Sequence, residues 1–234
     1  MTTPRAALLA LAALLLALPG TARAQEYSRF SGSFALLNTQ PLGNLSTGPG
    51  FGIAIAGDYA LDRFRIFRLR GEFRASVYDH ETREICFSST VGCRILLDLD
   101  TNYSIVYAGL GPQLVIPMGG PQLAFDGAIG WSAFTATSSL QGIDDQNESF
   151  GETTNYEDHT FAWSAGGELR IPFSARFGVG LGARYQHNGT VSYLREGGII
   201  DNPDGTLTLN PERTDANLVA ITLGLVFTPF TRGI

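Results

Sequence analysis

Lysine is absent from this 234-residue chain, and all 16 basic residues are arginine. Because a GC-rich genome can produce the same bias, this absence excludes nothing by itself. Charged residues make up 16% of the chain, well below the roughly 25% typical of soluble domains. The formal net charge of −6 argues against a nucleic-acid partner.

Long hydrophobic runs are also missing, since a membrane-spanning helix needs roughly 20 apolar residues. The first apolar run, residues 6–18, follows Arg5 and leads to Ala22-Arg23-Ala24, a small-x-small cleavage pattern. This arrangement predicts a cleaved signal peptide over residues 1–24 and a single mature domain over residues 25–234. Without Arg5 and Arg23, 14 basic residues face 22 acidic ones, a net charge of −8. The apolar run 218–227 is also too short to span a bilayer.

Cysteine is scarce, with only Cys86 and Cys93 present. An exported chain reaches an oxidising compartment, so we expect these two residues to form a disulfide. Closing so short a loop adds about 2 to 3 kcal/mol in the chain-entropy description. A metal or redox site would need further ligands, and only His80 is near in sequence. We therefore predict no metal site and no cofactor.

The stretch from Arg65 to Asp79 alternates between two kinds of side chain, which is the period of a β-strand and not of a helix. The apolar face holds Phe67, Leu69, Gly71, Phe73, Ala75 and Val77. The other face holds Arg68, Arg70, Glu72, Arg74, Ser76 and Tyr78.

Seven further segments show the same alternation, which predicts an all-β chain of eight strands. The connections alternate between long and short along the chain. Asp204-Gly205 in the last long connection predicts a protruding hairpin, and Pro112 with its neighbouring glycines predicts a bulge. The seven segments are Tyr27–Leu36, Phe51–Leu61, Asn102–Pro117, Leu123–Thr135 with a continuation toward Leu140, His159–Phe173, Phe177–Tyr193 and Asn217–Phe230.

One face of the predicted strands carries small residues interspersed with charges, which suits the interior of a narrow barrel. An eight-stranded barrel has room only for side chains, so its interior needs small residues and charges that pair. A soluble lipocalin-like barrel would need the reverse, an apolar interior. The residues predicted to form this lumen charge network are Arg29, Asp58, Arg68, Arg70, Glu72, Arg74, Asp126, Glu168, Arg170 and Arg184.

Aromatic residues on the opposite face gather toward the two ends of the strands. Phe51 and Tyr59 are eight residues apart, as are Phe177 and Tyr185, a span of about 20 Å for a tilted strand. This spacing is close to the apolar band of an outer-membrane barrel. The predicted girdles consist of Phe51, Trp131, Phe161, Trp163 and Tyr185 near the long connections and of Tyr59, Phe67, Phe173, Phe177 and Phe227 near the short ones.

With these features, the chain resembles the small eight-stranded outer-membrane β-barrels of the OmpA/OmpX-type superfamily over Gln25–Phe230. The resemblance implies an antiparallel up-and-down transmembrane barrel with long extracellular loops and short periplasmic turns. It also implies integral residence in the outer membrane of a Gram-negative cell, as a monomer in contact with lipid and lipopolysaccharide. Such barrels end on an aromatic residue that the insertion machinery recognises, and Phe230 is followed here by four more residues.

Two clusters leave alternatives open. The lumen charges form either a static plug of arginine–carboxylate pairs or a gate on a narrow polar path. The segment from Gln141 to Asp158 contains six acids and no basic residue, so it is either a solvated loop, a partner-binding loop or an oxygen-ligand site for a divalent cation. Its spacing fits no calcium-loop template.

His187 is the only histidine placed on an outward strand face, next to Tyr185. Its segment resembles the Arg-x-x-His stretch of outer-membrane lipid A deacylases over about ten residues. Where that family has a serine, two residues after the histidine, this chain has Gly189. Ser192 is predicted to face the lumen, which leaves His187 without a nucleophile.

We therefore predict a non-enzymatic outer-membrane barrel with a structural, adhesive or ligand-binding role through its extracellular loops. The alternatives are an outer-leaflet lipid A-modifying hydrolase that uses His187 and a narrow channel for small or hydrophobic solutes.

Overall fold

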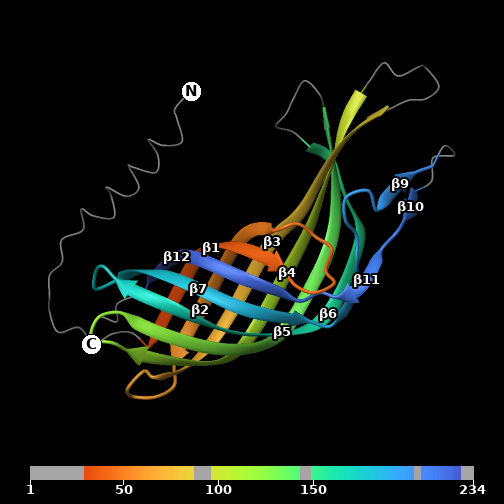
Figure 1. Cartoon of the computed structure of the whole chain (residues 1–234). Coiled ribbons are helices and arrows are strands. Elements are labelled where there is room, and N and C mark those ends of the chain that lie inside the picture. The colour runs from red at the N-terminus through yellow and green to blue at the C-terminus, as the bar shows by residue number, and fades with distance from the viewer. Residues whose placement is uncertain (1–28, 87–95, 143–148, 203–206, 228–234) are drawn as a thin grey trace.

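The computed structural model describes residues 29–86, 96–142, 149–202 and 207–227, so the predicted signal peptide lies outside the described residues. Eight strands form one closed antiparallel barrel in the spatial order β1-β12-β7-β6-β5-β4-β3-β2 (Figure 1). The predicted all-β class and the eight-stranded barrel are confirmed. The barrel strands are β1 (Phe30–Pro41), β2 (Gly50–Ala60), β3 (Phe67–Cys86), β4 (Leu96–Pro117), β5 (Gln122–Gly142), β6 (Ser149–Pro172), β7 (Phe177–Asn188) and β12 (Leu218–Phe227).

The two ends of the barrel differ in the length of their connections. Residues 61–66, 118–121 and 173–176 join strands at one end, which we call the short-connection end. Near this end Phe30 pairs with Tyr59 and Gly32 pairs with Phe227, so the first and last described strands begin and finish there. The described residues contain no helix that is long and apolar enough to cross a membrane.

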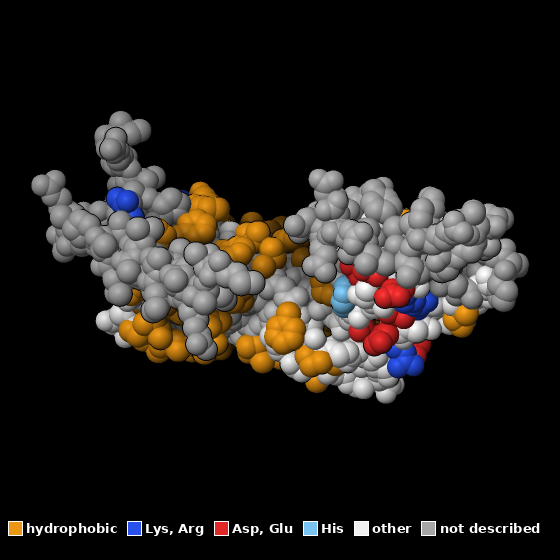
Figure 2. Space-filling model, turned by 90° about the horizontal axis from the view of Figure 1, so that it is seen from above, with side chains coloured by type: hydrophobic (Ala, Val, Ile, Leu, Met, Phe, Trp, Pro, Cys, Tyr) orange, Lys and Arg blue, Asp and Glu red, His pale blue; other side chains and the backbone are white. Residues whose placement is uncertain are grey.

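Alternating strand positions point outward and inward, as the strand period predicts. Phe73, Ile129 and Leu223 lie on the outside and are 43%, 65% and 54% exposed. Arg70 and Glu72 on the same strand as Phe73 lie inside and are 4% and 7% exposed. The barrel is therefore apolar outside and charged within, the reverse of a soluble barrel. Figure 2 shows hydrophobic side chains over the barrel wall and acidic ones gathered at the long-connection end.

Four neighbouring strands are twice as long as the other four. β3, β4, β5 and β6 have 20, 22, 21 and 24 residues, against 10 to 12 in the rest. At about 3.3 Å per residue, roughly ten extra residues project about 30 Å beyond the barrel mouth. Figure 1 shows this one-sided extension, formed by β3 to β6 at the long-connection end. The predicted bounds of β3, β4 and β6 were too short at that end, whereas the predicted continuation of the fifth strand toward Leu140 is confirmed.

Four short strands cover the same mouth. β8 (Thr190–Tyr193) pairs with β11 (Glu212–Asp215), and β9 (Ile199–Asp201) pairs with β10 (Leu207–Leu209). The β9–β10 hairpin confirms the one predicted around Asp204-Gly205, although residues 203–206 themselves are outside the described ranges. The predicted seventh strand is broken at Gly189, which separates β7 from β8.

The bulge predicted at Pro112 is wrong. The register between β4 and β5 is the same on both sides of this residue, because Leu110 pairs with Ile129 and Gln113 with Asp126. Between β3 and β4 the register shifts instead at Tyr78, between Val77 and Asp79. The extra residue lets both Tyr78 and Asp79 face the interior side, so the bulge redirects the upper half of β3.

Candidate functional site

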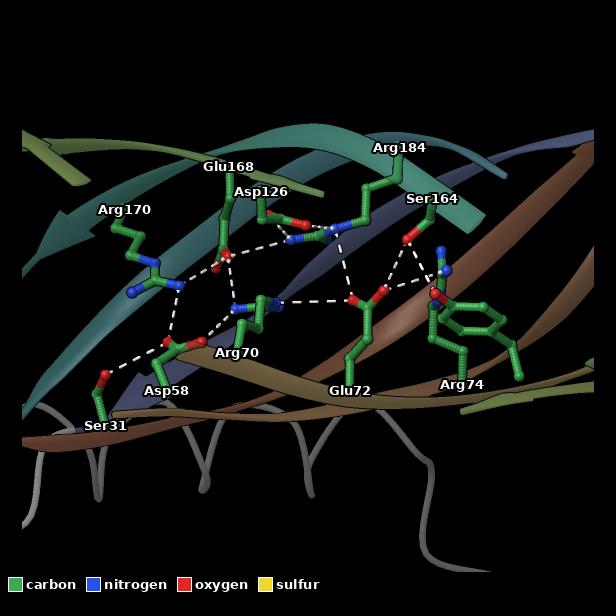
Figure 3. A network of polar contacts seen from close by, with 11 residues as sticks. Ser31, Asp58, Arg70, Glu72, Arg74, Asp126, Ser164, Glu168, Arg170 and Arg184 are labelled. Atoms are coloured by element: carbon green, nitrogen blue, oxygen red, sulfur yellow. Dashed lines mark hydrogen bonds and ion pairs between the residues drawn. The ribbon is translucent and has the colours of Figure 1, made fainter. Parts of the chain in front are cut away.

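Eight charged side chains fill the middle of the barrel interior. They come from inward positions two residues apart on β3 and β6 and from single positions on β2, β5 and β7, and each is at most 7% exposed. Four arginines face four carboxylates, so the layer is electrically balanced. Its members are Asp58, Arg70, Glu72, Arg74, Asp126, Glu168, Arg170 and Arg184, which we call the charged layer (Figure 3).

The side of the charged layer that faces the short-connection end is organised around Asp58, which is completely buried. Its two carboxylate oxygens accept hydrogen bonds from Arg70 Nη1 at 2.9 Å and Arg170 Nη2 at 3.0 Å. Arg170 Nη2 also reaches Glu168 at 3.1 Å. With its amide oxygen turned toward the arginines, Gln113 accepts from both at 3.2 and 3.1 Å. Two arginines and two carboxylates thus connect β2, β3 and β6 across the lumen.

Arg184 dominates the other half of the layer. Its guanidinium donates two hydrogen bonds to Asp126, from Nε at 2.9 Å and from Nη2 at 2.6 Å. Glu72 lies 3.6 Å from Arg184 and also accepts from Ser164 Oγ at 3.0 Å. A bidentate charge-assisted pair of this kind fixes both partners in one geometry.

Arg74 is the least satisfied member of the layer. Its nearest charge is Glu72, with Nη2 3.3 Å from Oε1, and its guanidinium lies 4.3 Å from the centre of the Tyr107 ring. None of its three side-chain nitrogens has a hydrogen bond among the described residues. A cavity of about 20 Å³ adjoins Arg70, Arg74 and Arg184, room for about one water molecule.

A layer of neutral polar groups lies next to the charged layer, on the side of the long connections. Gln186 Nε2 donates to Ser132 Oγ at 3.0 Å and to Asn188 Oδ1 at 2.8 Å. Asn188 in turn donates to the Ala216 carbonyl oxygen at 2.5 Å. These residues are at most 2% exposed, so this layer is as closely packed as the charged one.

The half of the interior nearest the long connections is apolar, in contrast to the charged lumen predicted from the sequence. Tyr78, Tyr103, Phe134 and Tyr193 pack together there, with ring centroids 6.2 to 6.5 Å apart. Leu45 and Ile199 from the connections complete the packing. We call this cluster the apolar plug; its buried members are Leu37, Leu45, Tyr78, Tyr103, Ile105, Phe134, Ala136, Val191, Tyr193, Leu194, Ile199, Ala216, Leu218 and Ala220.

Residues 194–197 of the β8–β9 connection are fastened to β3. Tyr78 donates its hydroxyl hydrogen to the Leu194 carbonyl at 2.7 Å. The backbone N–H groups of Glu196 and Gly197 donate to the carboxylates of Asp79 and Glu81, each at 3.1 Å. These three hydrogen bonds, which we call the loop clasp, hold the last long connection over the barrel mouth.

The loop clasp depends on the ionised form of Glu81. The Arg83 side chain, which donates a hydrogen bond to Glu81, holds the pKa of that carboxyl below its ordinary value against the opposing effect of partial burial. The N–H of Gly197 and the hydroxyl of Tyr103 lower the pKa further. Each of these groups favours the charged acceptor.

Two residues predicted for the lumen network lie apart from it. Arg29 precedes β1 and is exposed, although its carbonyl accepts a hydrogen bond from the Ala60 N–H of β2 at 2.8 Å. Arg68 is half-buried at the short-connection mouth, where it donates to Ser31 Oγ at 2.7 Å and to the Arg65 carbonyl at 3.3 Å. Neither forms an ion pair within the described residues, so the predicted six arginines reduce to four in the charged layer.

His187 lies outside the barrel, as predicted, with its ring 5.6 Å from that of Trp163. No hydrogen bond joins His187 to a hydroxyl or carboxylate among the described residues. Ser192 is not in the lumen as predicted, because the chain breaks register at Gly189 and turns Val191 and Tyr193 inward instead. The structure therefore does not assemble an acid–base–nucleophile unit around His187.

The predicted girdle aromatics lie on the outer surface at two levels. Trp131 pairs with Phe161 across β5 and β6, and Trp163 lies 5.5 Å from Tyr185 by ring centroids. Near the other end, Phe177 pairs with Phe227. Phe51, Trp131, Phe161, Trp163, Tyr59, Phe67, Phe173 and Phe227 are exposed, and Phe177 and Tyr185 are half-exposed.

The extension formed by β3 to β6 is held by polar cross-strand pairs. Thr101 Oγ1 lies 2.7 Å from Ser138 Oγ, and Ser104 Oγ lies 2.7 Å from Thr135 Oγ1. Such cross-strand pairs contribute to the stability of the sheet. The predicted disulfide cannot be assigned here, because Cys93 and the Cys86 side chain lie outside the described part of the chain, as do residues 143–148 of the acidic segment.

Acidic residues predominate on the described part of the extension, where Arg83 is the one arginine. No group of three potential metal ligands occurs among the described residues. The acids are Asp79, Glu81, Glu84, Asp98, Asp100, Glu152, Glu157 and Asp158.

The sequence model of the family described as "Outer membrane protein beta-barrel domain" matches residues 8–227. Comparison with curated protein sequences found no match. Among solved structures, Neisserial surface protein A is similar with a TM-score of 0.53 and 11% identity, over 88% of this chain and 100% of that one.

Two further solved barrels are similar at lower scores. Ail of Yersinia pestis, in complex with a heparin analogue, has a TM-score of 0.41 and 14% identity, over 86% of this chain and 96% of that one. A major outer membrane protein from Thermus thermophilus has a TM-score of 0.47 and 9% identity, over 85% and 99% of the two chains.

Proposed function

Because the chain belongs to the outer membrane protein beta-barrel domain family, we propose that it is an integral outer-membrane barrel that conducts no solute and acts through its extracellular surface. In this family the long connections face the cell exterior and the short ones the periplasm. The exposed apolar band between the aromatic girdles then contacts lipid, with lipopolysaccharide in the outer leaflet.

The continuous filling of the lumen supports the absence of conduction. A solute would have to pass the apolar plug, the neutral polar layer and the charged layer in turn. Separating a buried charged pair costs several kcal/mol, so opening the charged layer alone is expensive. The only space found inside the charged layer among the described residues, about 20 Å³, is too small for a hydrated ion.

Conductance of the purified protein in planar bilayers tests this closure. We expect no unitary currents, whereas a general porin reconstituted in the same way must give them. Clear unitary steps that scale with the amount of folded protein would refute the closed lumen and favour the narrow channel.

The extracellular extension supports a binding role. Its four long strands exceed the roughly 9 to 11 residues that a membrane crossing requires, so half of each strand stands in water. The excess of carboxylates there creates a negative potential that attracts cationic partners. We therefore propose that the extension binds basic surfaces or peptides.

Titration of a labelled oligolysine peptide into the detergent-solubilised protein tests this role. We expect saturable binding at low salt that weakens as salt rises, because exposed charges are screened. A triple variant, Asp98→Asn, Asp100→Asn and Glu152→Gln, should bind at least tenfold more weakly. Asp62→Asn, which removes a carboxylate at the opposite end, is the control and should bind normally. Equal binding by the triple variant and the wild type would exclude the extension as the binding surface.

A further inference from the structure

A cavity of about 410 Å³ opens at the periplasmic mouth of the barrel, on the far side of the charged layer from the apolar plug. Inward strand positions form its floor, and the β2–β3, β4–β5 and β6–β7 turns form its rim. Its volume is within the range of small-molecule sites. The floor includes Ser31, Arg68 and Arg170, and the rim includes Phe64, Arg65 and Arg176.

Among the described residues, four arginines line this cavity and no acidic residue does. Within the same part of the chain, Arg68 donates to neutral oxygens only, those of Ser31 and the Arg65 carbonyl. The nearest turn carboxylate, Asp62, accepts backbone N–H groups of Phe64 and Phe67 at 3.0 and 2.8 Å. Its charge is thus engaged in shaping the β2–β3 turn.

Arg170, on the cavity floor, is incompletely hydrogen-bonded. Its Nη2 donates to Asp58 and Glu168, whereas its buried Nε has no hydrogen-bond partner among the described residues. Figure 3 shows one edge of this guanidinium turned toward the two carboxylates and the opposite edge turned away from them. Buried donors without partners are rare and point to a water, ion or ligand that completes them.

The rim holds Arg65 in an unusual backbone conformation. Its φ of 60° lies in the left-handed region, which few residues other than glycine, asparagine and aspartate adopt. Such outliers gather where a turn positions a side chain for binding. Phe64, which is 82% exposed, and the nearby Pro117 and Pro172 add an apolar wall beside the arginines.

We propose that this cavity binds the phosphate group of an amphipathic phosphate ester. Arg68, whose hydrogen bonds among the described residues go only to neutral oxygens, and the three further arginines around the cavity match the charge and the planar two-point recognition that phosphate oxygens favour. The apolar wall would then contact the carbon portion of the ester. Two sources offer this chemistry at the periplasmic end: a soluble phosphate ester of the periplasm, or the headgroup of an inner-leaflet phospholipid.

Calorimetric titration of the folded full-length mature protein in maltoside micelles tests the proposal with one probe for each source. Glycerol 3-phosphate represents the soluble ester and dihexanoyl phosphatidylglycerol represents the lipid headgroup. We expect saturable one-to-one binding of at least one probe. Arg68→Gln should weaken it at least tenfold, because it removes a cavity charge without breaking an ion pair.

Arg213→Gln is the matched control, because Arg213 is exposed on β11 at the extracellular end. It changes the net charge equally and should alter affinity less than twofold. Should Arg68→Gln fail to fold, Arg176→Gln in the exposed β6–β7 turn replaces it. Binding of glycerol 3-phosphate supports the cavity with a soluble ligand, and binding of the lipid alone supports it with a headgroup. Absence of saturable binding by both probes, or equal weakening in the cavity and control variants, overturns the proposal.

Discussion

Arg184 on β7 and Asp126 on β5 form a two-point ion pair across the strand that separates them, with contacts of 2.9 and 2.6 Å. Both side chains are at most 3% exposed. This pair connects two strands that share no backbone hydrogen bonds, so it stabilises the closed form of the barrel in addition to the sheet itself. Its contribution is measurable because each partner can be changed separately.

Asp126→Asn should lower the free energy of unfolding by about 3 to 5 kcal/mol, because it leaves the Arg184 charge buried without its main partner. Urea unfolding in lipid vesicles, followed by the shift in gel mobility between folded and unfolded barrels, measures this change. Glu152→Gln, at an exposed position of β6, is the control and should fall within about 0.5 kcal/mol of wild type. A similar stability for both variants would show that the pair contributes nothing net.

Arg74→Met should behave differently from Arg184→Met, although both remove an arginine from the same layer. Arg74 makes no hydrogen bonds among the described residues, and Glu72 retains Ser164 and Arg184 without it. Replacing a poorly satisfied buried charge with an apolar side chain is often neutral or stabilising. We expect Arg74→Met to lie within about 1 kcal/mol of wild type in the same urea assay and Arg184→Met to lose about 3 kcal/mol or more. Equal losses would show that Arg74 contributes as much as Arg184.

The barrel could be predicted from sequence because alternation between apolar and polar residues survives wherever one strand face meets lipid. Phe73 and Arg74, or Leu181 and Gly182, show this directly. In the extension one face mixes apolar residues such as Leu99 and Leu140 with polar ones, and the other is polar, as at Thr82 and Asp100. The alternation is therefore weak there, and the sequence predicts long connections for most of these residues.

The site was predictable only in part, for two physical reasons. The charged layer follows from strand parity, which places Asp58 and Arg170 inside. Which arginine pairs with which acid depends on register across several strands, which parity does not give. The apolar plug had a partial signal, since Tyr78 has inward parity, but Leu194 and Ile199 arrive from a long connection whose path has no periodicity.

Glycines at close strand contacts should tolerate no side chain. A Cβ atom on Gly130 would overlap the Ala108 carbonyl oxygen, so the β4–β5 backbone would have to separate. We expect Gly130→Ala to destabilise the barrel by at least about 2 kcal/mol in urea unfolding. Gly120→Ala, in the β4–β5 turn with no atom within 4 Å, is the matched control and should be near neutral. Equal stability of the two variants would mean that the strands part easily.

The loop clasp should weaken in acid. Because the pKa of Glu81 is lowered in the folded protein, its contribution is complete above the unfolded pKa of about 4.3 and is lost as the pH falls through the folded value. The protection factor of the Gly197 amide, corrected for intrinsic exchange, should therefore fall below about pH 4.

The Glu81→Gln variant distinguishes the contribution of Glu81 from that of Asp79, the other carboxylate in the loop clasp. It should lower the Gly197 protection factor several-fold at neutral pH and reduce its dependence on acid, because a neutral amide oxygen is a weaker acceptor. Glu84→Gln, at an exposed position of the same strand, should leave the protection unchanged. A Gly197 amide that remains protected in Glu81→Gln would show that the clasp does not depend on this carboxylate.

The depth of the barrel in the membrane can be read from its two tryptophans, the only ones in the chain. Trp131 and Trp163 face outward and are 63% and 39% exposed. Trp163 pairs with Ile129, two residues from Trp131 toward the short connections, so it lies about 5 Å deeper after allowing for strand tilt.

In vesicles with brominated acyl chains, we expect the fluorescence of both residues to be quenched, each measured in the variant that replaces the other with phenylalanine. The ratio of quenching by deep to shallow bromines should be higher for Trp163, since the ratio cancels the shielding of Trp163 by Tyr185 and His187. If neither residue is quenched, this face of the barrel lies outside the lipid. A reversed ratio would indicate that the barrel is tilted or inverted relative to the family orientation.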